Sequence, residues 1–200
     1  MNKFSHTILF LLIAGFFVSC SPKNISSRYY FQNEKDLDQI EKSFRNSYRV
    51  HPFSIGFTSS DFRKVSVTVI TDTLNYIYDF TVGEERLADS LTRYRLPAKD
   101  ILSLIGNMQA IRCTWISNYD FYDDEKKRSL TFMSIKAVAL KRPFKKAKYY
   151  VLTYFQQPQY FDSEGRLLDR KKLRRLRKIN GEIFMRINDK VCYTVSERFR

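Results

Sequence analysis

Histidine, glycine and proline are scarce in this 200-residue chain, and tryptophan occurs once. The two histidines are His6 and His51, so a site that needs several imidazole ligands is excluded. A catalytic arrangement of the Ser-His-Asp type would have to use His51, which stands beside Pro52. With 6 glycines and 5 prolines, the chain also lacks a glycine-rich phosphate loop and a dinucleotide-binding fingerprint. The sequence therefore predicts no cofactor and no metal site.

Acidic residues are few relative to basic ones. The chain has 35 Lys and Arg against 21 Asp and Glu, which gives a formal net charge of +14. Hydrophobic residues nevertheless make up 44% of the chain and aromatic residues 16%, which is enough apolar surface to exclude disorder as the main state. We therefore expect one folded domain of ordinary size with a strongly positive surface.

A short apolar run opens the chain. Lys3 supplies a positive start, and the run extends from Ile8 to Phe17. It has the length of a signal-peptide core and is too short for a transmembrane span, which needs roughly 20 apolar residues. The run ends shortly before Cys20, which follows Val18 and Ser19. This segment resembles a bacterial lipoprotein signal, in which small or apolar residues precede a cysteine that receives a diacylglycerol group before cleavage.

The resemblance implies that residues 1–19 are removed and that Cys20 becomes the N-terminus, attached to a membrane by two or more acyl chains such as palmitate. Residues 20–33 are then a lipidated N-terminus and tether, and residues 34–200 form a single domain. Removal takes away one Lys and no acid, so the mature charge is 34 minus 21, or +13. In a Gram-negative cell, Ser21 would direct the protein to the periplasmic side of the outer membrane. An ordinary secretory signal with a chance cysteine is the alternative.

Hydrophobic periodicity divides the mature chain into helices and groups of strands. Apolar residues at helical spacing predict helices over residues 34–48, 84–94 and 97–108. Alternating apolar and polar residues predict strands over residues 53–58, 64–71, 74–80, 111–122, 129–140 and 149–155. A further helix is expected from Asp169 to Ile179, and a last hairpin turns at Asn188-Asp189 so that Met185 faces Cys192. These elements favour an α+β fold, an antiparallel sheet of meanders and hairpins with three to four helices packed on one side.

Two clusters of basic residues stand out near the C-terminus. On the predicted last helix, Leu173, Leu176 and Ile179 form an apolar stripe, and cations cover nearly the whole remaining face. These cations are Arg170, Lys171, Lys172, Arg174, Arg175, Arg177 and Lys178. The second cluster is a turn that contains Lys141, Arg142, Lys145, Lys146 and Lys148. Each cluster could be an ordinary solvated surface or an anion-binding surface, and no acidic run of matching length neutralises either.

The charge and the N-terminal signal together point to an envelope partner. Basic helices bind the phosphates of nucleic acids, but export argues against a nucleic-acid partner. A protein anchored at Cys20 stays close to lipid head groups, where each Lys or Arg contributes about 1 kcal/mol of attraction to an anionic surface. We therefore expect a non-enzymatic, lipid-anchored cell-envelope protein. Its basic surface would bind an anionic lipid head group, a phosphorylated glycolipid, an acidic envelope polymer or a partner protein of the envelope.

The remaining cysteines, Cys113 and Cys192, form an even pair in an oxidising compartment. Both lie on predicted strands among apolar neighbours. A disulfide between them would close a loop of ~80 residues and stabilise the fold by about 4 kcal/mol in the chain-entropy model. Two separate buried thiols that pack as small apolar groups are the alternative.

Carboxylates are densest in one stretch, Asp120 to Glu125, where they could act in glycoside hydrolysis or simply form a hairpin turn. An envelope enzyme that acts on glycan through these carboxylates is therefore the alternative function. The chain also has 13 Tyr and 17 Phe. Tyr29-Tyr30, Tyr149-Tyr150 and the stretch from Tyr119 to Tyr122 could stack against sugars, although core packing accounts for most aromatic residues.

Overall fold

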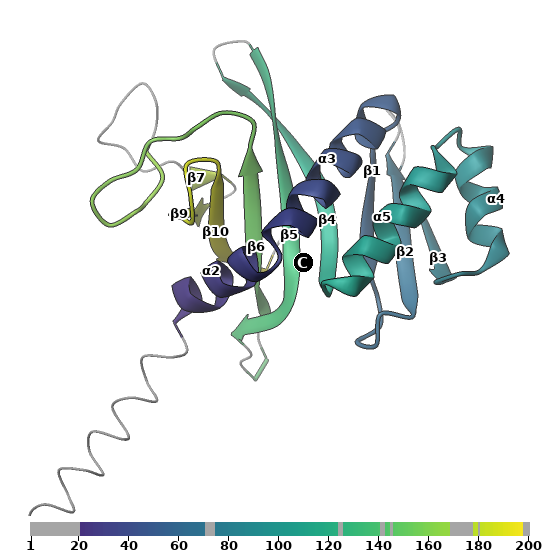
Figure 1. Ribbon diagram of the computed structural model, residues 1–200, viewed down its shortest axis with the longest axis horizontal. Helices are drawn as coiled ribbons and strands as arrows, with labels where there is room; N and C mark the ends of the chain where they lie inside the picture. The colour runs from purple at the N-terminus through teal and green to yellow at the C-terminus, as the bar shows by residue number, and fades with distance from the viewer. Residues whose placement is uncertain are drawn as a thin grey trace, which may run out of the picture.

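An antiparallel sheet of eight strands is the framework of the protein in the computed structural model (Figure 1). The structure describes residues 21–70, 75–123, 126–140, 143–144, 146–168, 178–179 and 181–197. The predicted signal segment and the predicted lipidation site, Cys20, lie outside these residues.

The order of strands in the sheet is β3-β2-β1-β4-β5-β6-β10-β9. Their bounds are β1 Phe53–Phe57, β2 Lys64–Ile70, β3 Asn75–Thr81, β4 Cys113–Asp123, β5 Lys126–Leu140, β6 Lys148–Phe155, β9 Met185–Arg186 and β10 Val191–Ser196. Every pair of neighbours is antiparallel, and a separate two-stranded ribbon joins β7 Lys178–Ile179 to β8 Glu182–Ile183. The pairing of β1 with β4 joins two meanders, β1-β2-β3 and β4-β5-β6, into one sheet.

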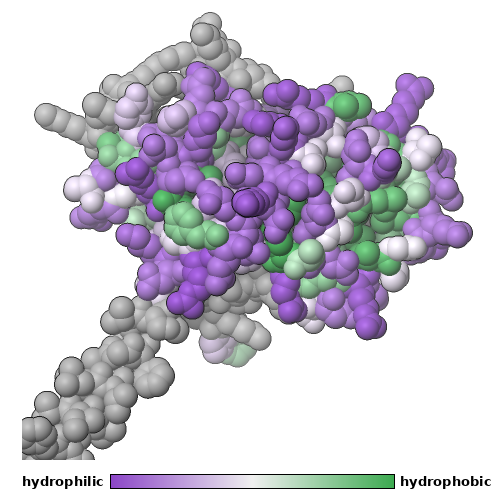
Figure 2. All heavy atoms as spheres, viewed as in Figure 1, coloured by the Kyte–Doolittle hydropathy of each residue, from purple (hydrophilic) through white to green (hydrophobic). Residues whose placement is uncertain are grey.

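The described part of the chain contains four helices, which pack on one face of the sheet (Figure 1). Their bounds are α2 Pro22–Gln32, α3 Glu34–Val50, α4 Glu85–Arg93 and α5 Ala98–Ala110. Hydrophilic residues cover most of the outer surface of this helix-bearing side (Figure 2). None of the described helices is long and apolar enough to cross a membrane. The predicted α+β fold, with an antiparallel sheet and helices on one side, is confirmed.

The main core lies between the helices and the sheet. Helix α3 buries Leu37, Ile40 and Phe44 completely, because these residues recur on one face of the helix. Strand β2 buries every second residue, including Val65 and Val67, against the same helices. The intervening residues of the strand therefore face the opposite side of the sheet.

The segment after Ser21 is not a tether, as the sequence had suggested, but helix α2 packed on the domain. The Ser21 hydroxyl accepts a hydrogen bond from the backbone N–H of Asn24 (3.2 Å) and caps the helix. Tyr30 is buried in the main core, and the Tyr29 hydroxyl donates to the carbonyl oxygen of Ile111 (2.9 Å). These two tyrosines hold α2 against the sheet, which a polar linker without apolar side chains could not do.

A second, smaller core lies on the opposite face of the sheet. It joins Phe132 of β5 and Phe155 of β6 to Leu167 and Phe184, which come from segments outside the main strands. Cys192 belongs to this second core, whereas Cys113 belongs to the main core under the helices. The structure therefore contains no disulfide between these two described cysteines, and the candidate bridge is wrong because the sheet separates the two side chains.

The C-terminal region departs from the predicted pattern in two places. Lys178 and Ile179 belong to β7 and not to a helix, because they pair with Ile183 and Glu182 of β8, and Gly181 before β8 has a φ of +80°. In the last hairpin, Cys192 pairs with Arg186 and not with Met185. Asn188 stabilises this shifted register, since its side-chain oxygen accepts the backbone N–H groups of Lys190 and Val191 and closes a loop that is one residue longer than expected. Met185 consequently packs with the main core and Cys192 with the second one.

Candidate functional site

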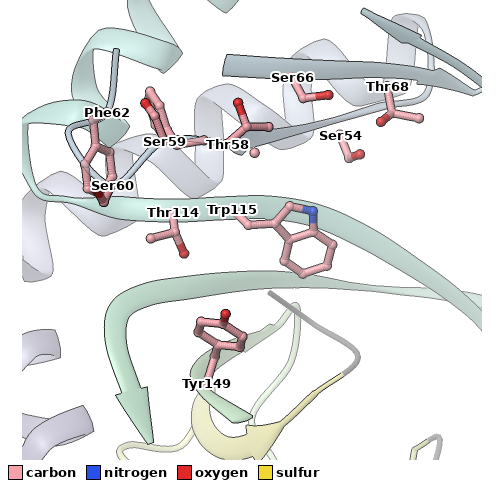
Figure 3. A pocket seen from close by; sticks show the side chains of 12 residues that line it. Ser54, Thr58, Ser59, Ser60, Phe62, Ser66, Thr68, Thr114, Trp115 and Tyr149 are labelled. Carbon is pink, nitrogen blue, oxygen red and sulfur yellow. The ribbon is translucent and has the colours of Figure 1, made fainter. Parts of the chain in front are cut away.

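A groove of about 730 Å³ lies on the face of the sheet opposite the helices (Figure 3). Strand alternation produces it, because the positions of β1 and β2 that do not face the main core hold small or polar residues. Ser54 of β1 pairs with Thr68 of β2, and Gly56 pairs with Ser66. The remaining lining residues are Phe57, Thr58, Ser59, Ser60, Phe62, Thr114, Trp115 and Tyr149.

The indole of Trp115 forms the aromatic wall of the groove. Trp115 on β4 stands opposite Gly56 on β1, and a Cβ atom at Gly56 would lie only 3.0 Å from the indole Cδ1. Any side chain at this position would therefore push the ring away from the strand. Tyr149 of β6 contributes a second ring, and both side chains project from the sheet in the close view (Figure 3).

One end of the groove is formed by the loop between β1 and β2, which is anchored on α5. Phe62 is 3% exposed and has a φ of 62°, a conformation that costs a non-glycine residue energy. Its ring packs on Phe57 with centroids 4.8 Å apart, and its carbonyl oxygen accepts a hydrogen bond from Gln109 of α5 (3.0 Å). These contacts hold the backbone in place and preform this end of the groove.

Local hydrogen bonds stiffen the same loop. The Ser59 hydroxyl accepts the backbone N–H groups of Arg63 (3.1 Å) and Lys64 (2.9 Å). The hydrogen bond from Ser59, followed by the one from the backbone of Arg63, lowers the pKa of the Asp61 carboxyl. The Ser59 hydroxyl therefore already has hydrogen-bond partners within the loop and is less able to contact a ligand.

The hydroxyls along the strands remain available to a ligand. Ser54, Ser66 and Thr68 have no hydrogen-bond partner among the described residues, whereas Thr114 donates to the carbonyl oxygen of Ser134 (3.1 Å) and can still accept. Neighbouring strands are about 4.8 Å apart and alternate residues of a strand roughly 7 Å apart, so these hydroxyls form a regular grid beside the indole. No charged side chain is among the described lining residues. The groove therefore suits a neutral ligand rich in hydroxyl groups.

Few of the predicted anion-binding residues lie in the described part of the chain. Lys146 is exposed, and Lys148 at the start of β6 directly precedes Tyr149 of the groove. Lys178 is in β7, as described above. The other predicted cations lie outside the described residues, namely Lys141, Arg142, Lys145, Arg170, Lys171, Lys172, Arg174, Arg175 and Arg177.

Of the predicted carboxylates, Asp120 and Asp123 lie on β4, whereas Asp124 and Glu125 lie outside the described residues. Asp123 pairs with Lys126, so the stretch from Asp120 runs toward the tip of the β4–β5 hairpin. The Asn118 side-chain amide donates to Asp120 (2.7 Å) and accepts a hydrogen bond from the Ser129 hydroxyl (2.6 Å). Among the described residues, Asp120 lines none of the four clefts found, and no group of His, Cys, Asp or Glu is placed to hold a metal ion.

The sequence analysis missed the groove residues other than Tyr149. Ser54, Ser66, Thr68 and Trp115 fall within the predicted strands 53–58, 64–71 and 111–122, but none of them was singled out as a binding residue. The signal that could have found them is the pairing of small and polar residues on consecutive strands with a glycine among them, which marks a close approach by another group.

The chain matches no protein-family model, and no curated protein or solved structure shows significant similarity to it.

Proposed function

We propose that the protein is a lipid-anchored component of the bacterial cell envelope that binds, without catalysis, a phosphorylated glycolipid or another acidic glycan. The observation that carries this proposal is the preformed groove on the helix-free face, with its grid of hydroxyls beside Trp115 and Tyr149. The sugar part of the ligand would occupy the groove, and its anionic groups would contact basic residues near it.

The groove has the two features that a saccharide needs. Hydroxyl side chains both donate and accept hydrogen bonds and can therefore pair with the hydroxyls of a sugar in several orientations. The faces of sugar rings carry C–H groups, which pack on aromatic rings such as that of Trp115, as other apolar surfaces do. A cavity of about 730 Å³ lies within the usual size of small-ligand sites, roughly 300–1,000 Å³.

The positive charge of the chain supports an anionic ligand. The mature chain would carry 34 basic and 21 acidic residues, a net charge of +13. Lys148 directly precedes Tyr149 on β6 and therefore faces the opposite side of the sheet, whereas exposed Lys146 lies three residues before Tyr149, just outside the strand. Of these two, Lys146 is the nearer basic residue for a phosphate or carboxylate attached to a sugar in the groove. Its interaction with an anion would weaken as salt is added, since the charge is exposed to solvent.

The position of α2 supports a location at the membrane surface. Only Ser21, the cap of the helix, separates the proposed lipidated Cys20 from the packed helix. An acylated protein would therefore be held directly against the head groups in one orientation, and not at the end of a long linker. Among the described residues, the contact of Asp120 with Asn118 on β4 gives no support to the alternative of an enzyme that acts on glycan.

Binding of the acylated protein to the purified phosphorylated glycolipid of its host tests the proposal. Thr68→Val keeps the shape of the side chain and removes one groove hydroxyl, whereas Thr92→Val makes the same change on α4, away from the groove. We expect Thr68→Val to weaken binding by up to about tenfold, the value of one hydrogen bond. Removing the phosphates should also weaken binding. Equal affinities of both variants and the wild type would contradict the proposal.

A further inference from the structure

A second cleft, of about 530 Å³, lies between α3 and the ends of β6 and β10, and it is acidic although the chain as a whole is basic. Glu34, Asp38 and Glu41 line it from α3, where positions three and four residues apart share one face of the helix. Asp189 lines it from the loop before β10. From the sequence, only the apolar stripe of α3 carried a prediction, and the acidic side chains of the helix carried none.

Tyr154 carries a buried hydroxyl at the wall of this cleft. Its side chain is 7% exposed, and its hydroxyl has no hydrogen-bond partner among the described residues. The ring lies 6.5 Å from that of Tyr30, measured between centroids. A buried hydroxyl without a partner costs roughly 1–3 kcal/mol. A ligand bound in the cleft beside the carboxylates would supply the partner that the Tyr154 hydroxyl lacks.

Several other polar groups of the cleft already have hydrogen-bond partners. The Tyr30 hydroxyl donates to Glu34 (3.1 Å) and accepts a hydrogen bond from the Asn188 amide (3.0 Å). Glu41 accepts a hydrogen bond from the Thr131 hydroxyl at 3.4 Å. Thr131 pairs directly with Tyr154 across β5 and β6, and Glu41 and Tyr154 line the same cleft.

The cleft has fewer basic than acidic side chains, since Arg45 and Lys190 line it together with four carboxylates. Arg45 approaches Glu41 at 3.6 Å, and Asp189 is bound to Arg186 at 2.6 Å. Asp38 has no ion pair among the described residues. Burial and the neighbouring Glu34 raise the pKa of Asp38, and burial raises the pKa of Glu41 despite the opposing effect of Arg45.

A compact organic cation fits this combination of groups. An ammonium group has three donors and no acceptor, so it can bind carboxylates and the oxygen of a tyrosine hydroxyl at the same time. A metal ion does not fit, because no described group of acidic residues is placed to hold one. The planar guanidinium group is wider than an ammonium and less suited to reach a buried hydroxyl.

We propose that this acidic cleft binds an alkylammonium group, which contacts the Asp38 carboxylate and the Tyr154 hydroxyl while its alkyl chain lies along the cleft wall. Pro158 and Phe155 supply apolar surface to that wall. The ammonium group belongs to a free diamine or to the side chain of a lysine.

Titration of the mature protein with 1,5-diaminopentane, followed by NMR, tests this inference. The neutral alcohol 1-pentanol serves as a control ligand of similar length. Nα-acetyl-lysine amide distinguishes the sources, because a stronger interaction with it than with the diamine supports a lysine side chain, and the reverse supports a free diamine. We expect saturable shifts of Asp38 and Tyr154 with the diamine and none with pentanol.

Matched variants locate the site. Asp38→Asn removes one charge from the cleft, whereas Asp36→Asn makes the same change at a second exposed position of α3, which does not line the cleft. We expect Asp38→Asn to weaken binding about tenfold, as for loss of one charged hydrogen bond, and Asp36→Asn to leave it unchanged. Tyr154→Phe keeps the packed ring and should also weaken binding. Equal affinities for all three variants, or equal binding of pentanol and diamine, would overturn the inference.

Discussion

Replacing Gly56 with alanine tests whether the indole of Trp115 lies against β1 as described. The new Cβ would stand 3.0 Å from the indole Cδ1 and 3.8 Å from the carbonyl oxygen of Thr114. Forcing an extra methyl group into such a contact typically costs about 1–3 kcal/mol. Alanine also restricts the unfolded chain more than glycine does, which offsets roughly 0.5–1 kcal/mol of this loss. We therefore expect Gly56→Ala to lower the free energy of unfolding by about 0.5–2 kcal/mol.

Gly106→Ala is the matched control. Gly106 lies in the interior of α5, and a Cβ atom there would meet nothing within 4 Å. The same substitution should raise the free energy of unfolding by about 0.8–1 kcal/mol, since alanine favours helix over glycine. Urea denaturation, followed by circular dichroism and by the fluorescence of Trp115, measures both variants. If Gly56→Ala stabilised the protein as much as Gly106→Ala does, the indole could not be packed on β1.

Three further predictions concern the rest of the fold. Tyr29→Phe removes the hydrogen bond to Ile111 and should lower the free energy of unfolding by about 1 kcal/mol. Amide hydrogen exchange in α2 should become faster. Because the folded protein raises the pKa of Glu41, ionisation of this residue opposes folding, so Glu41→Gln should stabilise the protein at pH 7 and lose this advantage below about pH 4. Burial raises the pKa of Cys113 to about 12. Alkylation of Cys113 and Cys192 should therefore require unfolding, yield two modified thiols and not depend on a reductant. Absence of modified thiols in the unfolded protein until a reductant is added would contradict their separate placement.

Much of the fold could be predicted because several elements carry a regular pattern. The apolar stripe of α3, from Leu37 to Phe44, and the alternation of Val65, Val67 and Val69 each have one buried face. One buried face determines both the type of an element and its orientation in the core. Proline geometry accounts for two helix ends. Helix α3 ends before Pro52, and α5 begins after Pro97.

The parts that were missed depend on contacts between distant segments. Helix α2 is held by Tyr29 and Tyr30, whose partners lie far along the chain, at Ile111 and Asn188. A local ambiguity accounts for the error at β7, because the sequence Asn180-Gly181 suits either a helix end or a tight hairpin turn, and Lys178 in fact pairs with Ile183.

The candidate site was missed for a similar reason. The groove arises where β1 meets β4, a pairing that brings Gly56 beside Trp115 across 58 intervening positions of the chain. Nothing local in either strand indicates that pairing. The sequence instead pointed to basic clusters, of which the described residues include only Lys146, Lys148 and Lys178.

The fluorescence of Trp115 tests the central claim most directly, because it is the only tryptophan of the chain and lines the groove. We predict that titration with the phosphorylated glycolipid changes its emission in a saturable way and shields the indole from a soluble quencher. The same titration of Thr68→Val should require a higher ligand concentration. Binding of the glycolipid that leaves both the emission and the quenching of Trp115 unchanged would contradict the claim that the groove is the binding site.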